Sequence, residues 1–435
     1  MRQFDSFAGA CLIAALLTAC SGSIGSFSTP TSVATPTSQP SPEVYGVVYS
    51  FKGRSDGANP VGGVIESQGS LYGTTYAAGG PGCNGAGCGT VFAVGLTGGE
   101  KTLYRFKGNL DGANPTSSLL SVDKILFGTT QSGGGSACGT GCGTVFSISP
   151  SGSERILYSF AGGTDGANPE AGLLNVRGEL YGTTEYGGNA ACQGGCGTVF
   201  KVARSSGKET VVYRFRGGKD GFHPVSPLIY VNGDFYGTTQ SGGFVSSSSN
   251  HACVYYAPGC GTVFKVSSSG RERVVARFFW SFSNPNGGAT PTAPLVYAND
   301  RFYGTTILGG TDGNATMFGP GCGTVYGMSP SGQLNFIHLF QQPNHYSCTA
   351  GAPNGLVIDN DWLYGTTQNP GTIFKVSPSG TFKSLHRFAG GTDGSLPLAG
   401  MVAAPNGLLY GTTYAGGGPG CYKNSGCGTI FEIMP

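Results

Sequence analysis

The sequence carries little charge: Asp, Glu, Lys and Arg make up 11% of its 435 residues, against roughly 25% in an ordinary globular domain. Its formal net charge is only +2, so we expect no nucleic-acid partner. No run of 18 apolar residues occurs, which argues against a membrane-spanning helix. The chain also lacks Cys-x-x-Cys spacing, a Gly-x-Ser-x-Gly elbow, a P-loop and a His-Glu-x-x-His motif, so no common catalytic or metal-binding signature is present.

Glycine and proline are abundant instead, with 79 and 25 residues respectively. Such a composition can indicate low complexity, but 39% of the residues are hydrophobic and a strict internal repeat is present. The combination predicts a folded β protein with many turns.

The N-terminal segment has the features of an export signal. An apolar stretch within residues 1–19 is too short to cross a bilayer, and it ends in Leu17-Thr18-Ala19-Cys20, which resembles a bacterial lipobox. The resemblance implies cleavage before Cys20 and lipidation of its thiol. The alternative is a plain secretory peptide in which Cys20 is incidental. Residues 20–43 are rich in Ser, Thr and Pro and are typical of an extended tether.

The remainder, residues 44–435, contains seven copies of one unit. An aromatic-Gly-Thr-Thr tetrad recurs, and a Gly-Thr-hydrophobic-aromatic motif follows each copy. The period is close to the roughly 50 residues of kelch-type propeller blades. In the third copy the pattern predicts four strands, which are Ala171–Val176, Glu179–Thr184, Gly197–Val202 and Glu209–Phe215.

The two ends of the repeat region complement each other. It begins with a lone fourth strand, Val47–Phe51, and ends with a third strand, Gly428–Ile433, that has no fourth strand after it. Pairing these two strands would remove an exposed sheet edge. The sequence therefore predicts an all-β, seven-bladed β-propeller of four-stranded blades, closed by an N-terminal strand that completes the last blade.

The repeat resembles a known bacterial family. Leu71-Tyr72-Gly73-Thr74-Thr75 followed by Gly89-Thr90-Val91-Phe92, recurring seven times, is similar to the GloVer-type tandem repeat of bacterial surface proteins. The family's members use varied anchoring signals, and the anchor here would be the N-terminal lipid. The resemblance implies a location at the cell envelope and no particular catalytic activity.

Ten cysteines form local pairs between the second and third strands of a copy, and the second member of each pair directly precedes the Gly-Thr motif. In an exported protein this spacing predicts hairpin disulfides that staple short loops, rather than metal ligands or free thiols. The remaining two, Cys322 and Cys348, lie in loops expected on one face, where a bridge would join adjacent blades. The predicted pairs are Cys83 with Cys88, Cys138 with Cys142, Cys192 with Cys196, Cys253 with Cys260, Cys322 with Cys348, and Cys421 with Cys427.

The repeated polar motifs point to architecture. Asp56-Gly57-Ala58-Asn59-Pro60 recurs in varied form and could hold cations, but its residue types fit turns. Hydroxyls of the Gly-Thr-Thr motif are expected to bridge neighbouring strands. The repeated aromatic residues are expected to pack between blades.

A binding site requires asymmetry, and the copies differ most in blades four to six. Aromatic side chains mixed with His, Asn and Gln in these loops fit a glycan or a protein surface, although drift in tolerated loops is the alternative. The candidate ligand-binding residues are His251, Tyr255, Tyr256, Trp280, Met317, Phe318, His345 and Tyr346.

These features predict a lipid-anchored binding module for glycan or protein at the cell envelope, at the outer membrane or cell surface. We expect a monomer that needs no cofactor, has no metal site, and contacts the membrane through its lipid. One alternative is a lyase or hydrolase with its site at the central channel, where clustered acids would support it; no catalytic residue can be assigned from the sequence. Another is a structural envelope component.

Overall fold

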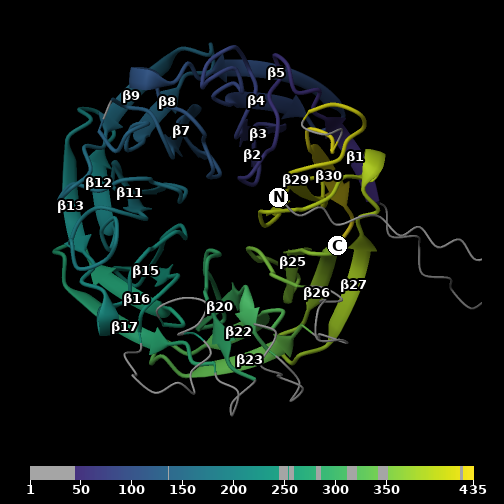
Figure 1. Cartoon of the computed structure of the whole chain (residues 1–435). Coiled ribbons are helices and arrows are strands. Elements are labelled where there is room, and N and C mark those ends of the chain that lie inside the picture. Colours follow the sequence, from purple (N-terminus) through teal and green to yellow (C-terminus); the bar gives the residue numbers. More distant parts are fainter. Residues whose placement is uncertain are drawn as a thin grey trace, which may run out of the picture. The chain divides into compact units, whose positions relative to one another are not determined.

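The computed structural model describes residues 45–435 apart from residue 136 and the segments 244–252, 254–258, 281–285, 311–320, 341–350 and 422–424. All described residues belong to one compact unit, Glu43–Pro435. In this unit seven four-stranded antiparallel sheets form a ring, which confirms the predicted seven-bladed propeller (Figure 1). No helix in the described part is both long and apolar enough to span a lipid bilayer.

Each of the first four blades runs outward from a short inner strand near the axis. Blade 1 contains β2 (Ile65–Ser67), β3 (Ser70–Thr75), β4 (Thr90–Gly95) and β5 (Gly98–Arg105). Blade 2 contains β6 (Leu120–Val122), β7 (Ile125–Thr130), β8 (Thr144–Ile148) and β9 (Glu154–Ser159). Blade 3 contains β10 (Leu174–Val176), β11 (Glu179–Thr184), β12 (Thr198–Ala203) and β13 (Glu209–Arg214). Blade 4 contains β14 (Ile229–Val231), β15 (Asp234–Thr239), β16 (Thr262–Ser267) and β17 (Glu272–Arg277).

The remaining blades have the same strand order. Blade 5 has an extra two-stranded sheet beside it, and blade 7 takes its outer strand from the N-terminal part of the chain. Blade 5 contains β19 (Val296–Ala298), β20 (Arg301–Thr306), β22 (Thr324–Met328) and β23 (Leu334–Leu339), beside a small sheet of β18 (Gly288–Ala289) and β21 (Leu308–Gly309). Blade 6 contains β24 (Val357–Asp359), β25 (Trp362–Gln368), β26 (Gly371–Val376) and β27 (Phe382–Arg387). Blade 7 contains β28 (Val402–Ala403), β29 (Leu409–Thr413), β30 (Thr429–Ile433) and β1 (Tyr45–Ser50). Three single-turn 3-10 helices occur in connections: η1 (Asn109–Asp111), η2 (Gly218–Asp220) and η3 (Gly391–Asp393).

The first strand of the described chain lies in the last blade. β1 pairs antiparallel with β30, with Tyr45 opposite Ile433 and Ser50 opposite Thr429. Directly after β1, Phe51 is 2% exposed and packs edge-on against Phe92 of blade 1, with 5.0 Å between ring centroids. This strand therefore covers the edge of β30, and its continuation fills the core between blades 7 and 1.

The inner strands are shorter than the sequence predicts. In blade 3 the prediction begins at Ala171, but β10 begins at Leu174. The preceding residues do not join the sheet, and Glu170 and Gly172 line a cavity on the ring axis.

Threonines of the Gly-Thr-Thr motif join strands and blades. In every blade the second threonine hydroxyl lies within hydrogen-bond distance of the threonine hydroxyl that opens the third strand, as predicted. The seven pairs are Thr75 with Thr90, Thr130 with Thr144, Thr184 with Thr198, Thr239 with Thr262, Thr306 with Thr324, Thr367 with Thr372, and Thr413 with Thr429. The first threonine hydroxyl instead donates to a carbonyl of the next blade, including Thr412 of blade 7, which donates to Gly62 of blade 1 at 3.1 Å. The same contact therefore also links blade 7 to blade 1.

The repeated aromatic residues pack between blades, as predicted. Tyr181 of blade 3 stacks on Phe235 of blade 4, with ring centroids 4.1 Å apart. Tyr236 packs against Phe302 of blade 5 in a tilted arrangement, with ring centroids 4.6 Å apart. These rings fill the space between neighbouring sheets and form no exposed stacking platform.

Five of the predicted disulfides are present, and each bridges a short loop between the second and third strands of a blade. They join Cys83 to Cys88, Cys138 to Cys142, Cys192 to Cys196, Cys253 to Cys260, and Cys421 to Cys427. Cys322 is also disulfide-bonded, whereas Cys348, its predicted partner, lies outside the described residues.

The interpretation of these bridges as loop staples is incomplete, because the second cysteine of each pair is a core residue. Each of these second cysteines is at most 2% exposed and belongs to a hydrophobic cluster between blades. They are Cys88, Cys142, Cys196, Cys260 and Cys427. Their burial follows from position, since each directly precedes the Gly-Thr that opens the buried third strand. The disulfides therefore fasten the loops to the core and do not form an exposed or reactive site.

Removing one of these bridges should have a measurable effect on stability. Closing a loop of about five residues lowers the chain entropy of the unfolded state by an amount worth about 2 kcal/mol. We expect the double variant with Cys138→Ala and Cys142→Ala to lose at least that much free energy of unfolding, measured by urea denaturation, because the buried Cys142 sulfur also leaves a small cavity. Ser268→Ala, at an exposed turn position, is the control. A loss as small as the control's would contradict a stabilising role for the bridge.

Candidate functional site

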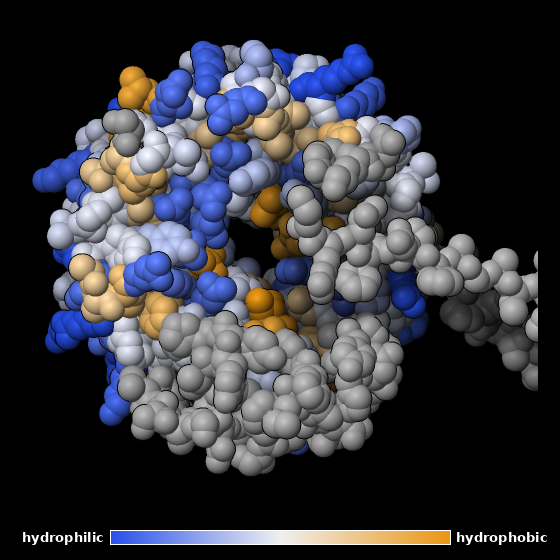
Figure 2. Space-filling model, in the orientation of Figure 1, coloured by the Kyte–Doolittle hydropathy of each residue, from blue (hydrophilic) through white to orange (hydrophobic). Residues whose placement is uncertain are grey.

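A pocket of about 440 Å³ lies on the axis of the ring, and every blade contributes to its wall. The contribution comes mainly from the connection that leads into each inner strand. The residue after the proline of this connection lines the pocket in all seven blades: Val61, Thr116, Glu170, Val225, Thr292, Asn354 and Leu398. Figure 2 shows the opening at the axis, with hydrophilic and hydrophobic residues meeting around it.

A second set of lining residues follows the Gly-Thr-Thr motif at the end of the second strand. Glu185, Gln240 and Gln368 reach the pocket from this position in blades 3, 4 and 6. Blade 3 is the one blade with glutamate at both positions, Glu170 and Glu185. The pocket is therefore asymmetric although the fold that builds it is repeated.

The carboxyl groups of Glu170 and Glu185 lie next to each other, close enough to share a hydrogen bond when one of them is protonated. The side-chain amide of Gln131, from blade 2, donates a hydrogen bond to Oε1 of Glu170. Two carboxyl groups this close repel each other when both are charged, which favours a proton shared between them.

The environment of the pair favours the protonated form. Burial raises the pKa of Glu170 above its ordinary value of 4.5, against the effect of hydrogen bonds from Gln131 and Glu185. Burial, followed by the charge of Glu170, raises the pKa of Glu185 to about 7, and a hydrogen bond with Tyr186 partly opposes this shift. At neutral pH the pair can therefore gain or lose a proton, which is a common property of functional sites.

The rest of the pocket wall is uncharged. The side-chain amide of Asn354 donates to the Thr366 hydroxyl at 3.0 Å and to the Pro397 carbonyl at 2.7 Å, and Gln368 donates to Asn354 at 2.9 Å. Apolar surface comes from Val61, Val225, Pro227, Pro294 and Leu398. The lining residues of this pocket include no Lys, Arg or His.

Most of the predicted ligand-binding residues fall outside the described part of the chain: His251, Tyr255, Tyr256, Met317, Phe318, His345 and Tyr346. Trp280 is described, and the prediction that it presents its ring to a ligand is wrong. Its side chain is 1% exposed and belongs to the core cluster of blades 4 and 5, together with Phe302 and Met328. Trp280, which the other blades lack, therefore fills this core.

The repeated Asp-Gly motif has the architectural role that its residue types predict. Asp111 accepts hydrogen bonds from the backbone N–H of Lys107 at 2.7 Å and from the Tyr104 hydroxyl at 2.6 Å. Asp165 and Asp220 make the same pair of contacts in their blades. The carboxylate thus fixes its own turn to the preceding outer strand.

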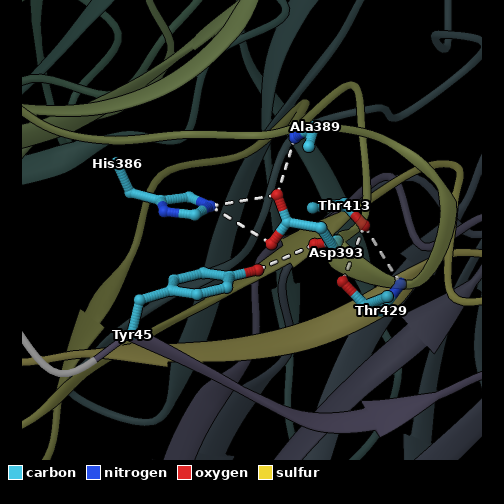
Figure 3. A network of polar contacts seen from close by, with 6 residues as sticks. All are labelled: Tyr45, His386, Ala389, Asp393, Thr413 and Thr429. Carbon is cyan, nitrogen blue, oxygen red and sulfur yellow. Dashed lines mark hydrogen bonds and ion pairs between the residues drawn. The ribbon is translucent and has the colours of Figure 1, made fainter.

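The copy of this motif before blade 7 also contacts the N-terminal strand (Figure 3). His386, in the place of the usual tyrosine, lies 3.2 Å from both carboxylate oxygens of Asp393. Tyr45 of β1 stacks on the His386 ring at 3.7 Å and donates its hydroxyl proton to the Asp393 carbonyl at 2.7 Å. This network ties β1 to blade 6 and is structural.

A second row of carboxyl groups lies where outer strands begin. Burial, followed by the charge of a neighbouring Asp-Gly aspartate, raises the pKa of Glu154 and Glu209 to about 7 and that of Glu272 to about 8. One carboxyl oxygen of each is buried without a hydrogen-bond partner among the described residues. The protonated, neutral form of these three carboxyl groups is therefore favoured over the charged form.

We expect the melting temperature to fall as the pH rises from 5 to 8. A glutamate with a raised pKa in the folded state stabilises fully below its ordinary value of 4.5, and this stability is lost as the pH rises through 7 to 8. Because these carboxyl groups are partly exposed, solvent screening limits the total to a few kcal/mol. The variant Glu154→Gln/Glu209→Gln/Glu272→Gln should show a flatter pH profile by scanning fluorimetry. An unchanged slope would contradict this assignment.

The repeat and the ring together define a class, the seven-bladed β-propellers built from tandem sequence repeats. Within that class the chain belongs to the Gloeobacter/Verrucomicrobia repeat family, whose model matches residues 34–250, 141–320 and 256–435. A search of curated proteins finds no relative by sequence.

Solved structures with the same architecture are distant in sequence. One is a catalytically inactive virginiamycin B lyase from Staphylococcus aureus, solved with quinupristin, which has a TM-score of 0.55 at 12% sequence identity. The match covers 90% of this chain and 100% of the lyase chain. The selenomethionine-substituted form of that lyase has a TM-score of 0.56 at 13% sequence identity, with the same coverage of both chains. At these identities the likeness establishes the fold and nothing about activity.

Proposed function

We propose that this protein is a lipid-anchored, extracytoplasmic propeller that binds a glycan or a protein at the cell envelope. The proposal depends chiefly on the axial pocket, which is large enough for a small ligand and has one chemically distinct blade. The pocket wall mixes carboxyl and amide groups with apolar surface, as binding sites for polar ligands do.

Export is supported by two independent features, the disulfides and the lipobox-like sequence. Disulfides persist in oxidising compartments outside the cytoplasm, and this chain has at least five. The lipobox-like sequence before Cys20 supplies an anchor. Metabolic labelling with a radioactive fatty acid should mark the wild-type protein and not Cys20→Ala. Equal labelling of both would refute the anchor.

Binding is tested with the full-length chain in mild detergent, screened against envelope polysaccharides and envelope extracts. We expect a saturable ligand. If the loops of blades 4 to 6 contribute, the variant Tyr255→Ala/Tyr256→Ala/Tyr346→Ala should bind more weakly. Tyr230→Ala, an exposed tyrosine on β14, is the matched control. A chain that retains neither polysaccharide nor protein would refute the proposed function and favour a structural role.

The acid pair also gives some support to an enzyme. Carboxyl groups that share a proton can act as general acid and base, as a lyase or hydrolase requires. Turnover of a bound polysaccharide by wild type and its loss in Glu185→Gln would favour catalysis. Binding without turnover would favour the binding module.

A further inference from the structure

The axial pocket has an unbalanced charge. Glu170 and Glu185 face it, and none of its lining residues is cationic. The ion pairs of the described residues involve other carboxylates: Glu179, Asp123, Asp234 and Asp393. A carboxyl pair facing a cavity without a protein cation is best satisfied by a cation on the ligand.

The surroundings of the pair indicate what kind of cation fits. A metal ion with hard ligands usually takes three or more protein or water oxygens, and the described residues bring together no group of three His, Cys, Asp or Glu side chains. The cavity of about 440 Å³ is also much larger than an ion. Its size and its mixed wall fit an organic molecule that carries a charged amine.

The order of the blades places further groups around the pair. Thr116 of blade 2 and Gln240 of blade 4 flank it, and Gln368 of blade 6 lies across the axis. These side chains can exchange hydrogen bonds with hydroxyl groups. Pro227 and Pro294 add flat apolar surface of the kind that the C–H face of a sugar ring contacts.

We propose that the axial pocket binds an amino sugar with a free amine, whose ammonium group is held by Glu170 and Glu185. This inference rests on the proposed function and narrows its ligand to glycans that carry unacetylated amines. The pair accepts hydrogen bonds from the ammonium group once its shared proton has left, so binding releases protons to the buffer. The hydroxyl groups of the same sugar meet the amide and hydroxyl side chains of the other blades.

The experiment is calorimetric titration of the full-length chain with a glucosamine oligosaccharide and with its N-acetylated counterpart. We expect the amine form alone to bind. Because the N-acetyl group removes the charge but also adds bulk, the matching glucose oligosaccharide, which has a hydroxyl in place of the amine, is titrated as well and should not bind. Titration in buffers of different ionisation enthalpy at pH 6.5 should reveal the proton release.

Variants locate the site. Glu170→Gln/Glu185→Gln should weaken binding of the amine form roughly 10- to 100-fold and abolish the proton release. Glu179→Gln, at the start of β11, whose far end leads into Glu185, removes a carboxylate that does not line the pocket and should bind as wild type does. Thermal melting of each variant checks that it is folded.

Three results would overturn the proposal in different ways. Equal binding of the two oligosaccharides, unaffected by Glu170→Gln/Glu185→Gln, would refute the amine pocket but leave glycan binding intact. Equal or tighter binding of Nα-acetyl-lysine methyl ester would replace the sugar with a lysine side chain of a protein partner. Failure of both oligosaccharides, with another envelope ligand retained in the screen, would refute the amino sugar and not the proposed function.

Discussion

A chain that begins at Phe51 is expected to aggregate instead of forming a folded monomer. It lacks β1, so the edge of β30 loses its partner strand and exposes a row of unpaired backbone groups. It also lacks Tyr45, which contacts His386 and Asp393 at the junction with blade 6. Blade 7 would then have three strands, and the core between blades 7 and 1 would open beside Phe51.

The matched control is a chain that begins at Glu43, the first residue of the compact unit. Size-exclusion chromatography and thermal melting should give a monomer with one cooperative transition for the control. The shorter chain should elute as aggregate or melt without cooperativity. Two chains with the same elution volume and melting temperature would show that the ring does not depend on β1.

The repeat made much of this fold predictable. The same strand pattern occurs in seven copies, so each copy tests the prediction made from the others. The strand that ends in Gly-Thr-Thr is therefore predicted correctly even where a single copy is ambiguous. In blade 3 the predicted strand Glu179–Thr184 matches β11 to the residue. The threonine pairs follow because Thr184 and Thr198 occupy opposite positions on neighbouring strands. Local chemistry of this kind is visible in the sequence.

The central channel is expected from the sequence only as the site of an alternative enzyme, and the acid pair in its pocket is not predicted, because only folding brings the two residues together. Glu170 and Glu185 look scattered in the sequence, where each lies beside a different turn. A signal was nevertheless present: aligning the seven copies at the residue after the proline and at the residue after Gly-Thr-Thr gives glutamate at both positions in one blade only. Both positions face the axis, a fact that the strand pattern alone does not reveal.

Trp280 shows the opposite error, in which an unusual residue was interpreted as functional. Its departure from the repeat suggested an exposed binding surface. In the structure it fills the core where blade 5 has the small extra sheet of β18 and β21. A residue that differs from the repeat can thus fill space created by another difference nearby. Only the packing in the structure distinguishes such a core residue from a ligand-binding residue.

The glycine of the Gly-Thr-Thr motif is expected to be indispensable because an aromatic ring crosses it. A Cβ atom at Gly182 would lie 2.6 Å from Cζ of Phe200 on the adjacent strand and 3.1 Å from Cδ2 of Leu173. Phe200 is completely buried and packs edge-on against Phe160 of blade 2, with ring centroids 5.0 Å apart, so it has no room to move. We expect Gly182→Ala to cost about 1–3 kcal/mol and Phe200→Ala about 3–5 kcal/mol of the free energy of unfolding.

The two changes should not be additive. In the Phe200→Ala background the ring that clashes with the new methyl group is gone, so Gly182→Ala should cost nothing or restore some stability by filling the cavity. Urea denaturation of the wild type, the two single variants and the double variant measures this coupling. Gly80→Ala, where the added Cβ has no neighbour within 4 Å, is the control for glycine replacement itself. A Gly182→Ala penalty of equal size in both backgrounds would mean that Leu173 or the backbone conformation, and not the crossing ring, explains the glycine at this position.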